Sequence, residues 1–69
     1  MTFGDNIRQA REAAGLTRFE LSVKIYEREA NIEAWEKSQR LPRALTLKKL
    51  ALALGTTVDE LLKDLPQGE

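Results

Sequence analysis

Apolar residues recur along this chain three or four positions apart, which is the period of a helix with one buried face. Short polar or Gly- and Pro-containing segments separate five such stretches, and no stretch alternates in the way that is typical of a strand. We therefore expect an all-α, five-helix globule, with helices at about residues 3–14, 18–25, 29–37, 44–54 and 58–64.

Residue types at the expected helix ends agree with these bounds. Thr2 can cap the first helix, and Thr-x-x-Glu patterns that start at Thr17 and Thr57 predict capping boxes for the second and fifth. The expected helices are interrupted at three positions, namely Gly15, Pro42 and Gly55. The expected buried stripe of the first helix is Phe3, Ile7, Ala10 and Ala14, and that of the fourth is Leu47, Leu50, Ala51 and Leu54.

The second and third expected helices are short and are separated by only a tight turn. Helix, turn and helix is the arrangement in which one helix lies across a DNA backbone while the next enters the major groove. The pattern therefore indicates DNA binding, with residues 29–37 as the recognition helix.

Length and composition limit the alternatives. The chain has 69 residues, and we expect one domain at residues 1–65 with a frayed tail at 66–69. It has no Cys and no His, so we expect no disulfide, no metal or other cofactor, and no His-based catalysis. The longest purely apolar run, residues 50–54, is too short to span a bilayer, and the first residues lack the pattern of a leader. We expect a cytoplasmic, non-enzymatic protein with no membrane or small-molecule partner.

The charge is balanced overall but unevenly placed. Eleven basic and eleven acidic residues give a net charge of zero, which is low for a DNA-binding domain. The segment from Lys37 to Lys49, just after the expected recognition helix, nevertheless has cations and no acid. That position favours phosphate contacts over an ordinary solvated face.

Several segments together resemble the helix-turn-helix domain of the phage repressor and Cro type, also called the Xre family, over about residues 3–63. They are Ile7-Arg8-Gln9-Ala10-Arg11, Gly15-Leu16-Thr17, Ile32-Glu33-Ala34-Trp35-Glu36, Arg40-Leu41-Pro42, Leu50-Ala51-Leu52-Ala53-Leu54-Gly55 and Val58-Asp59-Glu60-Leu61-Leu62. The resemblance implies a small repressor-like transcriptional regulator that binds double-stranded DNA sequence-specifically. It also implies a weak homodimer on a palindromic operator, with residues 58–65 as the expected dimer surface.

The resemblance assigns roles to particular positions. Arg11 and Glu36 fall where relatives place a structural ion pair. Contacts to the DNA backbone are expected from Thr17, Arg18, Lys37, Gln39, Arg40 and Arg43. Base reading is expected from Arg28, Glu29, Ala30, Asn31 and Ala34, since Arg can pair with guanine, Asn with adenine, Glu with the cytosine amino group and Ala with a thymine methyl.

Three departures from the family pattern keep other functions open. Tyr26 stands at the turn position that is normally Gly, the third helix lacks its usual Ser or Thr cap, and Glu27 and Glu29 bring negative charge towards phosphates. One alternative is an antitoxin- or adaptor-like module that uses the third helix to bind a protein. Another is a redesigned or drifted scaffold of the repressor fold without an operator.

Overall fold

The computed structural model describes residues 2–63, and its five helices confirm the all-α fold. The helices are α1 (Phe3–Ala13), α2 (Arg18–Ile25), α3 (Glu29–Glu36), α4 (Ala44–Leu54) and α5 (Val58–Leu61). The expected tail at 66–69, and any part of the fifth helix after residue 63, lie outside the described residues. Within the described part of the chain, no helix combines the length and apolar content needed to cross a membrane.

Side-chain caps define where three of the helices begin. The Thr17 hydroxyl accepts a hydrogen bond from the Glu20 amide at 3.0 Å, and the Glu20 carboxylate accepts one from the Thr17 amide at 2.9 Å. Thr2 and Asp5 form the same reciprocal capping box before α1. At α5 the Thr57 hydroxyl accepts from the Glu60 amide at 3.0 Å, which is half of the expected box. These caps satisfy amides that have no partner inside the helix.

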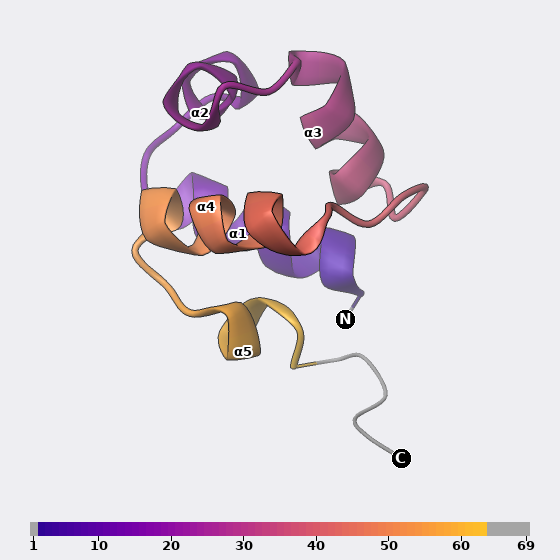
Figure 1. Ribbon diagram of the computed structural model, residues 1–69. Coiled ribbons are helices and arrows are strands. Elements are labelled where there is room, and N and C mark those ends of the chain that lie inside the picture. Colours follow the sequence, from indigo (N-terminus) through magenta and orange to yellow (C-terminus); the bar gives the residue numbers. More distant parts are fainter. Residues whose placement is uncertain (1, 64–69) are drawn as a thin grey trace.

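The helices surround one core to which all five contribute. Figure 1 shows α2 and α3 on one side of the α1 and α4 pair, and α5 on the other. α3 packs against α1 and α2, and α4 packs against α2 and α5. The largest fully buried side chains are Ile7, Leu21, Ile25, Ile32, Leu50 and Leu61. Apolar residues three or four positions apart lie on the same face of a helix, and the burial of these side chains shows that this face is turned inward.

One predicted core position is wrong. Ala14 is exposed, because α1 ends at Ala13 and Ala14 is its C-cap residue. Gly15 follows with φ at 74°, a left-handed conformation that turns the chain away from the helix axis. The inward-facing stripe of α1 therefore ends at Ala10, which packs against the core, and does not reach Ala14.

Gly4 lets α1 approach the end of α3 closely. A Cβ atom at Gly4 would lie 2.2 Å from the carbonyl oxygen of Glu36 and 2.7 Å from that of Trp35. The Gly4 amide also donates to the Ser38 hydroxyl at 3.3 Å. This contact holds the first helix against the start of the α3–α4 loop.

Candidate nucleic-acid interface

The turn between α2 and α3 keeps its helix-turn-helix geometry without glycine. Tyr26 takes a left-handed conformation, with φ 58° and ψ 45°, and its amide donates to the Ser22 carbonyl. Its side chain is 89% exposed, so packing does not explain why tyrosine stands there. The strain of a non-glycine residue is therefore accepted at this turn and not relieved by a different backbone path.

The start of α3 is open to a ligand. Arg28 is the N-cap residue, and its side chain makes no capping hydrogen bond. Arg28, Glu29 and Ala30 are all exposed, whereas Ala34 is half-buried. The buried residues Ile32, Trp35 and Glu36 lie on the opposite face, so the helical period turns Ala30 and Ala34 outward.

Glu27 joins the turn, α3 and α4 through its carboxylate. One carboxylate oxygen accepts a hydrogen bond from the Asn31 side-chain amide at 3.0 Å, and the other accepts from the Thr46 hydroxyl at 3.4 Å. The Asn31 side-chain oxygen in turn accepts from the Arg40 guanidinium. Glu27 is half-buried, and both oxygens of its carboxylate accept hydrogen bonds from side chains of the protein.

Two residues that were expected to bind DNA, Asn31 and Arg40, also make hydrogen bonds in this network. Asn31 uses one N–H and one oxygen lone pair of its side-chain amide, which leaves a second N–H and a second lone pair with which it could pair with adenine. Arg40 is exposed and uses one guanidinium nitrogen in its contact with Asn31. Its position at the rim of the α3–α4 loop is thereby fixed from within the protein.

The α3–α4 loop gathers the remaining expected phosphate contacts. Lys37, Gln39 and Arg43 are exposed, and Arg43 is the N-cap residue of α4 without a capping side-chain bond. The Lys37 ammonium lies 2.8 Å from the Glu33 carboxylate, and this hydrogen bond lowers the pKa of Glu33. A shallow pocket of about 380 Å³ lies between the loop and α3, and it is lined by Glu27, Asn31, Trp35, Arg40, Leu41, Pro42, Arg43 and Thr46.

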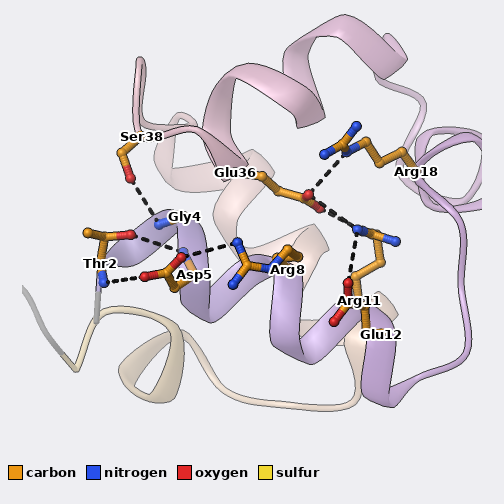
Figure 2. Close-up of polar contacts among 9 residues, drawn as sticks. All are labelled: Thr2, Gly4, Asp5, Arg8, Arg11, Glu12, Arg18, Glu36 and Ser38. Carbon is orange, nitrogen blue, oxygen red and sulfur yellow. Dashed lines mark hydrogen bonds and ion pairs between the residues drawn. The ribbon is translucent and has the colours of Figure 1, made fainter.

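Glu36 is the anionic centre of the helix packing beneath this surface. Its side chain is 2% exposed and lies 2.6 Å from Arg11 Nε and 3.1 Å from Arg18 Nε (Figure 2). The hydrogen bond from Arg11 to Glu36 raises the pKa of Arg11. Arg11 Nη1 also donates to the Leu16 carbonyl at 2.9 Å. α1, α2, α3 and the first loop are therefore fixed to one another at a single carboxylate.

Arg18 consequently has a structural contact in addition to its expected contact with DNA. Its side chain is 37% exposed and shares Glu36 with Arg11. Thr17, its neighbour, is exposed, and its hydroxyl caps α2. A phosphate at this helix end would meet the remaining guanidinium nitrogens of Arg18 and the first amides of α2.

Sequence reasoning missed the structural contacts of Glu27 and Thr46. Glu27 lies four positions before Asn31, a spacing that could have indicated their contact. Thr46 comes from α4, nineteen positions from Glu27, and no local pattern indicates that they meet.

Comparison with known proteins shows the family to which the chain belongs. A family profile described as helix-turn-helix matches residues 7–61, so the chain belongs to the Xre-type helix-turn-helix family, as its sequence predicted. It is 31% identical over 62 residues to the HTH-type transcriptional activator BcrR of Enterococcus faecalis, covering 90% of this chain and 30% of BcrR. A chain of the SinR protein/SinI protein complex shares the fold, with a TM-score of 0.82 and 23% identity over 91% of this chain and 62% of that chain. This chain thus spans under a third of the length of BcrR.

Proposed function

We propose that this chain binds double-stranded DNA sequence-specifically, as the DNA-binding domain of a transcriptional regulator, with α3 in the major groove. The observation that carries the proposal is the exposed, uncapped start of α3 beside a loop of cations, in a chain of the helix-turn-helix family. The name of BcrR as a transcriptional activator supports a regulatory and non-enzymatic role. Such a regulator would act in the cytoplasm.

The cations and polar groups at the rim would hold the phosphate backbone. Arg40 lies in the middle of the α3–α4 loop and Arg43 at its end, and Lys37 and Gln39 precede them. Thr17 and Arg18 would meet the neighbouring strand at the start of α2. Contacts of this kind set the position of the protein on the duplex and carry no sequence information.

Sequence would be read by the exposed side chains at the start of α3. Arg28 and Glu29 have donor and acceptor groups for guanine and cytosine, and Ala30 and Ala34 offer methyl groups to thymine. Asn31 would read adenine with the N–H and the oxygen lone pair that its contacts with Glu27 and Arg40 do not use. If Glu29 accepts from a cytosine, Glu29→Gln relaxes preference at that base pair by ~1 to 3 kcal/mol and raises the affinity for unrelated DNA.

One domain of this size offers a small DNA interface, so we infer that two copies bind a palindromic operator as a weak dimer. Half-sites about one helical turn apart would place two α3 helices in successive major grooves.

The salt dependence of binding tests the backbone contacts directly. Arg40→Ala and Arg43→Ala should each weaken binding to all duplexes and lower the slope of log affinity against log salt by about one. Lys63→Ala, at the far end of the described chain, should leave the slope unchanged. A loss confined to one base position would place that arginine in a groove as a reader.

A second candidate function rests on the acidic residues of α3. Glu29 is exposed and Glu33 half-exposed on the outer side of this helix, so α3 would also suit a basic protein surface. Loss of a captured basic protein on Glu29→Gln, with no measurable duplex binding at low salt, would favour this function.

A further inference from the structure

A shallow apolar groove between α2 and α4 is framed by lysines. It has a volume of about 340 Å³ and is lined by Lys24, Lys49, Leu52 and Ala53. Leu52 is 74% exposed, although it belongs to the most apolar helix of the fold. Leu45 lies seven positions earlier on the same face of α4 and is 67% exposed.

The lysines of this surface have no anionic partner in the described structure. Within residues 2–63, neither Lys24 nor Lys49 forms an ion pair, and Lys48 beside them forms none. Glu20, one turn before Lys24 on α2, uses its carboxylate to accept the Thr17 amide. Within residues 2–63 the groove therefore combines exposed leucines with lysines that form no ion pair.

We propose that this groove docks an acidic, leucine-bearing amphipathic segment of a protein partner. A leucine of that segment would cover Leu52 and Ala53, and carboxylates beside it would pair with Lys24 and Lys49. Helices of this kind bind grooves through apolar anchors spaced three or four positions apart. The proposal does not depend on DNA binding, because none of the side chains that we propose to contact DNA lines the groove; Lys49 ends the acid-free segment 37–49, so its effect on DNA binding is measured separately below.

The two other sources of negative charge fit less well. Duplex DNA would neutralise the lysines but offers no aliphatic side chain to cover Leu45 and Leu52. A second copy of this chain has acidic residues on α5, namely Asp59 and Glu60. Of the leucines beside them, Leu61 is 2% exposed in the core and Leu62 is half-buried, so a folded α5 offers little leucine surface to the groove.

The test uses a synthetic helix-forming peptide of about 15 residues with leucines on one face and glutamates beside them. Fluorescence anisotropy would measure its binding to the whole chain at about 0.15 M ionic strength. We expect saturable binding that Leu52→Glu weakens at least about tenfold. A peptide of the same composition, with its leucines scattered around the helix, should not bind.

A charge-reversal experiment distinguishes this docking from non-specific binding. The double variant Lys24→Glu/Lys49→Glu should lose the acidic peptide and gain the version in which lysines replace the glutamates. Lys63→Glu and Phe19→Glu are the matched controls, since both change exposed side chains outside the groove and should alter affinity less than about twofold.

Three results would overturn the proposal. They are the absence of saturable binding by the acidic peptide, equal binding of the ordered and scattered peptides, and equal losses in the groove variants and the controls. If Lys49→Glu and Leu52→Glu instead reduce duplex DNA affinity as strongly as Arg40→Ala does, the groove belongs to the nucleic-acid surface and the proposal also fails.

Discussion

Glu27 Oε1 accepts a hydrogen bond from Asn31 Nδ2 at 3.0 Å, so the turn before α3 is tied to the helix that follows it. Asn31 also accepts a hydrogen bond from Arg40, so α3 is connected through Asn31 to the loop that follows it. Glu27 thus has a structural role in addition to the negative charge that it carries beside the proposed DNA interface.

Removing the Glu27 carboxylate should loosen this part of the fold. Glu27→Ala leaves the Asn31 amide and the Thr46 hydroxyl without their acceptor, and we expect a loss of about 1.5 kcal/mol in the free energy of unfolding. Glu29→Ala is the matched control, because Glu29 is exposed and should change stability by less than about 0.5 kcal/mol. Urea denaturation measures both. Equal effects of the two substitutions would mean that the Glu27 contacts contribute nothing specific.

Replacing Tyr26 with glycine should stabilise the turn between α2 and α3. Tyr26→Gly should raise the free energy of unfolding by about 1 kcal/mol, because glycine takes the left-handed conformation without a Cβ clash. Little packing is lost, since the side chain is 89% exposed. Tyr26→Ala keeps the Cβ atom and should give no such gain in thermal unfolding. If alanine stabilises as much as glycine, the tyrosine side chain and not the backbone is the source of the strain.

Because α1 lies so close to α3, we expect a glycine-to-alanine substitution in α1 to lower stability. In most helix interiors Gly→Ala stabilises by about 0.5 to 1 kcal/mol. Gly4→Ala should instead destabilise by at least about 1 to 3 kcal/mol, because its Cβ would lie 2.2 Å from a backbone carbonyl oxygen. Calorimetry would show the difference in melting temperature, and a stabilised variant would disprove the close contact.

Acid should remove part of the stability of α1. The hydrogen bond from the Thr2 amide lowers the pKa of Asp5, with a smaller contribution from Arg8. The folded pKa lies below the unfolded value of about 3.9. The stabilisation is therefore complete above that value and is lost as the pH falls through the folded pKa. Stability measured from pH 6 to about pH 2 should fall less steeply in Asp5→Asn than in the natural chain. Parallel curves would show that Asp5 does not titrate differently in the folded state.

Local rules predicted the helices but not every partner across the fold. The box at Thr17 and Glu20 involves residues three apart, so the sequence alone was enough to place the start of α2. Arg18 joins Glu36 eighteen positions away, and Glu27 joins Thr46 nineteen positions away. Such contacts depend on how the helices pack, and no periodicity encodes them. The ion pair of Arg11 and Glu36 could be anticipated only because the family resemblance supplied it.

The ratio of affinities for two duplexes is the direct test of sequence-specific binding by this chain. A palindrome would first be selected from a randomised duplex pool, and the affinities of the whole chain for it and for a scrambled duplex of equal composition would then be compared at about 0.15 M salt. We expect at least about a thousandfold preference for the selected palindrome. Equal affinities for the two duplexes, with weak binding that disappears as salt is raised, would contradict sequence-specific recognition by α3.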